Sequence, residues 1–191
     1  MLIAGLLRHC GGFTWGYNQN PYFDSKTDSK NYLLVLASVP VISGVIGTTT
    51  GGAITGFLRR SKTFPGIKSS LLVLGVCNCI AAPGMALMLY YDPPYSYYFL
   101  LTFYVFAETW FGIYLIAVSE LFKPEYRGGA IGYTIFLLRL VAGSLPGLIL
   151  SPLKASLGYF WALIIMVPGM YFLAALVWLF LFFSMPSKHE I

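Results

Sequence analysis

The sequence predicts an all-α, polytopic membrane protein with six transmembrane helices. Only 10% of its 191 residues are charged, 58% are hydrophobic and the mean hydropathy is +0.74, whereas about a quarter of residues are charged in an ordinary soluble domain. Six stretches are long enough to cross a hydrocarbon core as helices, which takes roughly 20 residues. None alternates apolar with polar residues as the shorter strands of a membrane β-barrel do. We expect residues 1–185 to form one bundle and residues 186–191 to form a cytoplasmic tail.

The six predicted spans are residues 2–19, 32–58, 69–91, 97–122, 128–153 and 157–183. The first has no basic residue before its apolar run and is interrupted by Arg8, which favours a spanning helix over a signal peptide. Its abrupt start at Met1 suggests that the chain begins inside a larger protein.

Glycine and proline mark packing and bending sites along these spans. In the second span, the pairs Gly47/Gly51 and Gly52/Gly56 have the small-xxx-small spacing that lets helix backbones approach closely in lipid. Prolines in the third, fifth and sixth spans, at Pro83, Pro146 and Pro168, free backbone carbonyls and permit bends. Residues 143–147 are the most easily kinked, so Gly143 and Pro146 are candidates for a gate.

Basic residues are unevenly divided between the two sides of the predicted bundle. With six spans, both termini share a side with the loops 59–68 and 123–127. Seven Lys and Arg residues lie there and three on the other side: Arg59, Arg60, Lys62, Lys68, Lys123, Arg127 and Lys188 against Lys26, Lys30 and Lys154. Short loops rich in Lys and Arg stay in the cytoplasm, so both termini should be cytoplasmic. No loop is long enough to form a nucleic-acid recognition face.

Three charged residues are expected near the middle of the membrane. Glu108 and Arg139 each lie 11 residues from the end of a predicted span, which is about 16 Å at 1.5 Å per residue in a core about 30 Å thick. Arg8 has the same depth if the first span ends near Gln19. A charge there costs about 2.5–3.5 kcal/mol on insertion scales, so it is tolerated beside an opposite charge or a watery cavity.

Two interpretations of these charges remain open. In one, Glu108 and Arg139 form a buried salt bridge that only locks two helices together. In the other, the three charges form a polar centre with one positive charge in excess, which invites an anionic solute or lipid headgroup that an arginine grips through two bonds. Under this second interpretation the substrate-binding candidates are Arg8, Glu108, Arg139, Trp110 and Asn18, whose amide could line an outer vestibule.

Further polar residues have expected structural roles at the inner face. Glu120 should reach Arg127 or Lys123 across the turn after the fourth span and hold the inner ends of the fourth and fifth helices together. Arg59 and Arg60 are also candidates for a structural or gating role there. Cys77 and Cys79 lack the further ligands of a zinc site, so we expect no metal and no cofactor.

The order of these elements resembles the C-terminal half of a major facilitator superfamily transporter, and most closely spinster-like members. Residues 8–18 look like the seventh helix of that family. Residues 108–112, followed by the turn 120–127, look like its tenth helix and the loop after it. Residues 52–60 occupy the place of the superfamily's loop motif, and Gly56 fills the acidic position of that motif.

The resemblance implies a secondary active transporter that works by alternating access, with two six-helix bundles rocking about a site at the midplane. The first, second, fourth and fifth helices here would line the cavity, while the third and sixth would face lipid. The implied solute is a small amphiphilic or anionic organic molecule, such as a lysolipid or sphingolipid. The implied partner is a missing N-terminal half, from the same gene product or a paired chain, in a plasma or endolysosomal membrane.

The main alternative is a non-transporting structural or partner-binding membrane protein. Tolerance of neutral residues in place of Arg8, Glu108 and Arg139 would favour it. An intramembrane enzyme is disfavoured, because a serine protease needs a Ser and a His in facing helices and the chain offers only His9 and His189.

Overall fold

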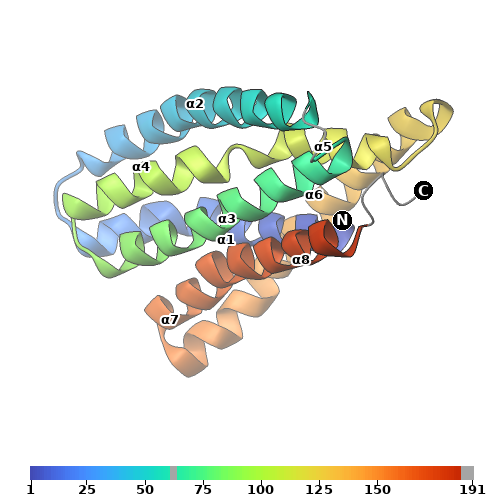
Figure 1. Ribbon diagram of the computed structural model, residues 1–191. Coiled ribbons are helices and arrows are strands. Elements are labelled where there is room, and N and C mark those ends of the chain that lie inside the picture. Colours follow the sequence, from blue (N-terminus) through green and yellow to red (C-terminus); the bar gives the residue numbers. More distant parts are fainter. Residues whose placement is uncertain (61–63, 186–191) are drawn as a thin grey trace.

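Long apolar runs become helices in a membrane because a helix satisfies its own backbone hydrogen bonds. The computed structural model describes residues 1–60 and 64–185, and this part of the chain is helical throughout, with no strand (Figure 1). The rods are α1 (Leu2–Lys26), α2 (Tyr32–Arg60), α3 (Ile67–Tyr90), α4 (Tyr95–Ala107) continued by α5 (Trp110–Glu120), α6 (Arg127–Leu157), and α7 (Tyr159–Ile164) continued by α8 (Met170–Ser184). The predicted all-α class is confirmed.

Five of the rods are long and apolar enough to cross a membrane: Tyr32–Arg60, Ile67–Tyr90, Tyr95–Glu120, Pro124–Leu157 and Tyr159–Ser184. α1 is not among them, although it has 25 residues. It runs past the expected end at Gln19, and its last turns carry Asn20, Asp24 and Lys26. Its assignment as a sixth span therefore stays a prediction.

The connections alternate between the two ends of the bundle. The start of α1, the end of α5 and the end of α8 lie at one end, which we call the terminal end (Figure 1). The connections α1–α2, α3–α4 and α6–α7 lie at the other, which we call the hairpin end. The predicted arrangement of consecutive antiparallel rods is what the structure has.

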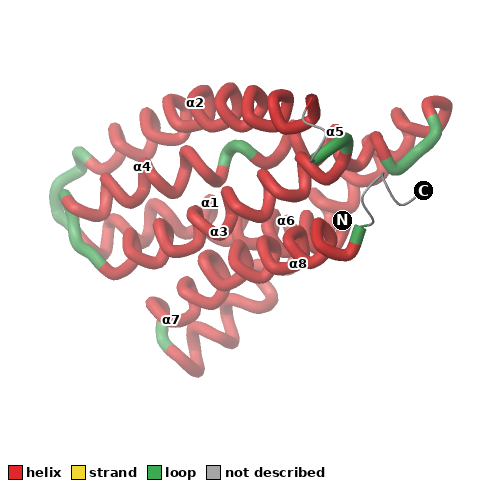
Figure 2. Tube along the Cα trace, viewed as in Figure 1, coloured by secondary structure: helices red, strands yellow, loops and turns green. Residues whose placement is uncertain are grey.

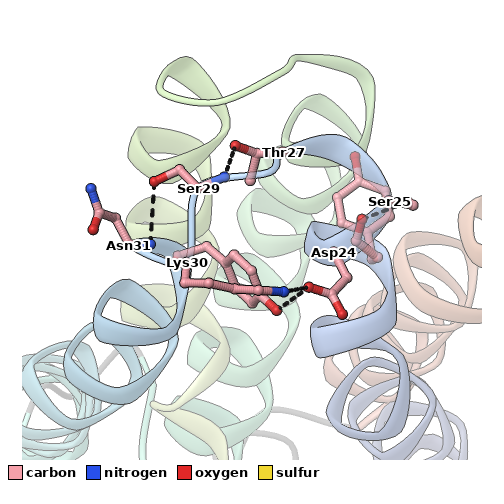
Figure 3. Close-up of polar contacts among 8 residues, drawn as sticks. Asp24, Ser25, Thr27, Ser29, Lys30 and Asn31 are labelled. Carbon is pink, nitrogen blue, oxygen red and sulfur yellow. Dashed lines mark hydrogen bonds and ion pairs between the residues drawn. The ribbon is translucent and has the colours of Figure 1, made fainter.

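Ion pairs fix the hairpin end. Lys30 Nζ and the Tyr32 hydroxyl both donate to Asp24 Oδ1 at 2.6 Å, which ties the α1–α2 connection to the last turn of α1 (Figure 3). Lys26 Nζ pairs with Asp92 Oδ1 of the α3–α4 connection at 2.7 Å. Lys26 and Lys30 at this end thus each form an ion pair with an aspartate.

At the terminal end, the expected partner of Glu120 was wrong. Glu120 Oε1 pairs with Arg59 Nη1 at 2.8 Å, so the contact joins α5 to α2 rather than to α6. Arg127 Nε instead donates to the Phe122 carbonyl at 3.3 Å. The reason is that α2 packs beside α5, whereas the backbone of Lys123 is extended and leads the following turn away from Glu120. Lys62 and Lys188, which entered the count of basic residues, lie outside the described residues, as does the proposed tail 186–191.

Burial is unequal among the rods. Within the bundle, 61% of the apolar stretch of α3 is buried, against 17% for α2 and 17% for the rod containing α6. The expectation that the third helix mainly faces lipid is therefore wrong, because α3 packs against α4, α5 and α8 at the centre. α2 and α6 present broad open faces. α6 buries only a stripe at every fourth residue: Thr134, Leu138, Ala142 and Pro146.

Close packing of α2 depends on one of its two predicted glycine pairs. A Cβ at Gly47 would overlap the Val105 carbonyl oxygen, and one at Gly51 would lie 2.9 Å from Thr109 Cβ. Nothing lies within 4 Å of a Cβ built at Gly52 or Gly56. α2 therefore packs closely on the α4–α5 rod at Gly47 and Gly51. Gly52 and Gly56 lie on the open face of α2 instead.

Two rods are irregular near their middle. The fourth predicted span is interrupted at Glu108 and Thr109, seen as the short loop segment between α4 and α5 in Figure 2. The last predicted span contains a π turn, η2 (Ile165–Gly169), around Pro168. A 3₁₀ turn, η1 (Pro124–Tyr126), precedes α6.

Candidate functional site

Arg8 is buried at the centre of the bundle, with 4% of its surface exposed. Its guanidinium carbon lies 4.5 Å from the centroid of the Trp110 ring and 4.6 Å from that of the Tyr171 ring. Trp110 belongs to the hydrophobic cluster at the terminal end, and Tyr171 to the cluster at the hairpin end. The cation therefore lies at the boundary between the two clusters, close to two ring faces that attract it.

Glycines on α1 make room for this arrangement. A Cβ at Gly12 would come within 2.8 Å of Arg8 Nη1, and one at Gly11 would come within 2.9 Å of the Tyr171 ring. Tyr171 follows the π turn closely, and such turns are frequent at functional sites. Side chains on α1 and the irregular backbone of η2 thus fit together around the guanidinium.

Arg8 also contacts the break in the fourth rod. Its Nη2 donates to the carbonyl oxygen of Ala107 at 2.7 Å. Ala107 is the last residue of α4, and the last carbonyls of a helix have no partner within the helix. Arg8 Nε, although buried, has no hydrogen-bond partner in the described part of the chain.

A cavity of about 350 Å³ lies beside this cluster. It brings together four of the predicted site residues: Arg8, Glu108, Trp110 and Arg139. Aromatic rings make up much of the remaining wall: Phe13, Trp15, Phe103, Tyr104, Phe111 and Tyr171. Such a cavity offers apolar surface together with both signs of charge.

The predicted salt bridge between Glu108 and Arg139 is not formed. Ion pairs among the described residues join Lys26 to Asp92, Lys30 to Asp24 and Arg59 to Glu120, and none of them includes Glu108 or Arg139. Arg139 is exposed on α6, with its guanidinium carbon 5.9 Å from the centroid of the Phe13 ring. Both charged groups can therefore meet a ligand in the cavity.

His9 adds an unpaired polar atom to the same wall. Its ring lies edge-on to Phe13, with centroids 4.9 Å apart, and 5.4 Å from the Trp110 ring. Its Nε2 is buried and has no hydrogen-bond partner among the described residues. A polar group of a bound molecule would give this nitrogen a partner, which an apolar wall cannot.

Asn18 lies apart from the cavity. Its Nδ2 donates to the Thr14 carbonyl at 2.7 Å, and its Oδ1 accepts from the Tyr159 hydroxyl at 3.2 Å. The first bond lies within α1, and the second ties α1 to the start of α7. The predicted vestibule role has no counterpart in the residues that line the cavity.

The other predicted gating residues lie on the two open helices. Arg60 is exposed at the end of α2, and α6 continues through Gly143 and Pro146 without a break. Pro146 is buried, and nothing lies within 4 Å of a Cβ built at Gly143. Their role in a gate stays a prediction.

Sequence analysis missed Tyr171 and Tyr104 as site residues. Trp15 Nε1 donates to the Tyr104 hydroxyl at 3.1 Å, and that hydroxyl donates to Gln19 Oε1 at 3.1 Å. Pro168 marks the bend that precedes Tyr171, but no spacing in the sequence connects either tyrosine to Arg8.

Comparison of the chain with family models, with curated proteins and with solved structures found no match.

Proposed function

We propose that this chain is one six-helix half of a secondary active transporter, and that its central cavity binds the transported solute. The observation that carries the proposal is that Glu108 and Arg139 line the same aromatic cavity without pairing with each other. Charges inside membrane proteins are expensive and usually mark a pathway for an ion or a substrate. The resemblance of the sequence to the C-terminal half of a major facilitator superfamily transporter, and to spinster-like members in particular, agrees with it.

The chemistry of the wall supports an amphiphilic organic anion, such as a lysolipid or sphingolipid, as the solute. Arg139 offers a planar fork of donors that matches a carboxylate or phosphate. The rings around it offer apolar surface for a hydrocarbon part. A small hydrophilic anion would leave those rings without contact.

A binding measurement tests this proposal. We expect a lysophospholipid with a phosphate headgroup, added below its micellar concentration to the purified chain in detergent, to raise the unfolding temperature by several degrees as its concentration exceeds the dissociation constant. The matched control is a monoacylglycerol with the same acyl chain and no charge. An equal rise with that control would mean nonspecific adsorption, and would favour the alternative of a non-transporting structural or partner-binding protein.

The proposed partner is a second six-helix bundle, from the same gene product or a paired chain. The open faces of α2 and α6 support it, since only 17% of each apolar stretch is buried, and α2 carries Gly52 and Gly56 with open space around them. We expect the 191-residue chain alone to give proteoliposome uptake no higher than empty liposomes. Robust uptake by the monomeric chain would overturn the need for a partner.

The proposed orientation places the terminal end in the cytoplasm. Five described Lys and Arg residues lie at the terminal end and three at the hairpin end: Arg59, Arg60, Lys68, Lys123 and Arg127 against Lys26, Lys30 and Lys154. Short loops rich in Lys and Arg stay in the cytoplasm. In a chain without its three cysteines, a cysteine at exposed Tyr95 should react with an impermeant maleimide from outside, or from the lumen of an organelle. A cysteine at exposed Glu125 should react only after permeabilisation. The reverse pattern would invert the topology.

A further inference from the structure

Arg8 is placed to act on the backbone rather than on a ligand. Its guanidinium carbon lies within 5 Å of the centroids of the Trp110 and Tyr171 rings, and Nη2 is bonded to the Ala107 carbonyl. Ala107 immediately precedes Glu108 and ends α4. Arg139, in contrast, is exposed and lines the cavity from α6. The two arginines of the cavity therefore have different surroundings.

We infer that Arg8 is a positioning residue, which holds the break between α4 and α5 in the form that directs Glu108 to the cavity. The Glu108 amide still donates to the Tyr104 carbonyl at 2.9 Å, so the hydrogen-bond ladder is interrupted only after that bond. The backbone of Glu108 and Thr109 stays in the right-handed helical region. At the next residue, the Thr109 hydroxyl provides a partner for the Phe106 carbonyl by donating to it at 2.7 Å. The bond from Arg8 reaches this break from α1 and satisfies the carbonyl that ends α4. A side-chain hydrogen bond also joins Cys77 of α3 to Thr109.

Tyr171 and the π turn determine where the guanidinium lies. The centroid of the Tyr171 ring lies 4.6 Å from the guanidinium carbon, and Tyr171 is 1% exposed. No described hydrogen bond joins its hydroxyl to Arg8, so the contact is through the ring. α8 therefore contributes to the geometry of Glu108 without contacting Glu108 through any described hydrogen bond.

The inference rests on the proposed function only in treating the cavity as the binding site, and its test needs no substrate. In a chain without Cys10, Cys77 and Cys79, Glu108→Cys places a thiol at the cavity. The probe is methyl methanethiosulfonate, a neutral reagent whose rate reports how often position 108 faces the cavity. Adding Arg8→Met should slow the reaction about tenfold, the shift that follows the loss of one charge-assisted hydrogen bond.

One further variant, Arg139→Gln, separates positioning from charge. Arg139→Gln removes a charge from the same cavity without touching the break, so it should change the relative rates of cationic and anionic reagents. Because a lost positive charge also raises the pKa of the thiol, each neutral rate is divided by the thiolate fraction taken from its pH profile. This corrected neutral rate should stay within about twofold in Arg139→Gln. Arg8→Met should change the neutral rate itself. A neutral rate unchanged by Arg8→Met, with charged rates altered as in Arg139→Gln, would overturn the inference and make Arg8 a solute-facing charge.

Gel filtration shows whether Arg8→Met folds. If it does not, two substitutions of Tyr171 provide the same test. Tyr171→Phe keeps the ring and should leave the neutral rate unchanged, whereas Tyr171→Leu removes it and should slow the reaction as Arg8→Met does. Equal rates in Tyr171→Leu and Tyr171→Phe would overturn the inference. Failure of lysophospholipid binding with these labelling results intact would instead count against the proposed function alone.

Discussion

Replacing Arg139 with glutamine should weaken binding of the lysophospholipid by about 10- to 100-fold, the change expected from losing a charge-assisted hydrogen bond worth about 1.5–3 kcal/mol. The structure leaves this guanidinium without an ion pair to any described residue, beside a cavity of about 350 Å³. The affinity of Arg139→Lys should lie between those of the unmodified chain and Arg139→Gln, since an ammonium keeps the charge but not the two-bond fork. Each purified variant is titrated with the lysophospholipid, and the dependence of its unfolding temperature on ligand concentration gives the affinity.

The matched control is Lys154→Gln, which removes one positive charge from the same helix but outside the cavity. Lys154 Nζ lies 4.8 Å from the centroid of the Tyr159 ring near the end of α6. The affinity of this variant should stay within about twofold of that of the unmodified chain. Lys154 is exposed and lies about 22 Å along α6 from Arg139 at 1.5 Å per residue, which is more than a Debye length, so its charge is largely screened. An equal loss in both variants would point to general electrostatic attraction. Recovery of folding and binding in the double swap Glu108→Arg with Arg139→Glu would show instead that the two residues act as a salt bridge.

Gly47→Ala should lower the free energy of unfolding by about 2 kcal/mol or more, since forced overpacking typically costs 1–3 kcal/mol. The added methyl group would overlap the Val105 carbonyl oxygen, which is backbone and cannot rotate away. α2 would be pushed off the α4–α5 rod. Urea or thermal unfolding of the purified chain, monitored by its helical signal, measures the loss.

Gly52→Ala on the same helix is the control for that change. Nothing lies within 4 Å of the added atom, and replacing glycine in a helix removes backbone freedom from the unfolded chain, which stabilises by about 0.4–1 kcal/mol. The two substitutions should therefore act in opposite directions. Equal and small effects would mean that α2 does not pack through Gly47.

Patterns within one segment predicted much of the fold. The apolar stretches, the helical class and the close packing at Gly47 and Gly51 are all readable from spacing along the chain. Glu108, Arg139 and Arg8 have the same predicted depth in the membrane, and all three line one cavity. Composition and helical rise suffice for such features, because each depends on the segment itself.

Features set by another helix were not predictable in the same way. Neither glycine nor proline marks the break at Glu108 and Thr109, and Arg8 contacts it from 99 residues away in the sequence. Glu120 pairs with Arg59 of α2, whereas local reasoning assigned it a neighbour in the next turn. The Tyr171 ring reaches Arg8 because of a π turn whose extra residue leaves no periodic signal.

The irregular turns also affect how the bundle can bend. An uninterrupted helix resists bending through its ladder of hydrogen bonds, and sharp bends occur where that ladder is disturbed. The ladder is disturbed beside Arg8 in two neighbours of α1, at the α4–α5 break and at η2. Two of the sites at which the rods can bend therefore lie at the level of the cavity. The walls around a bound molecule can flex there without unfolding the helices on either side.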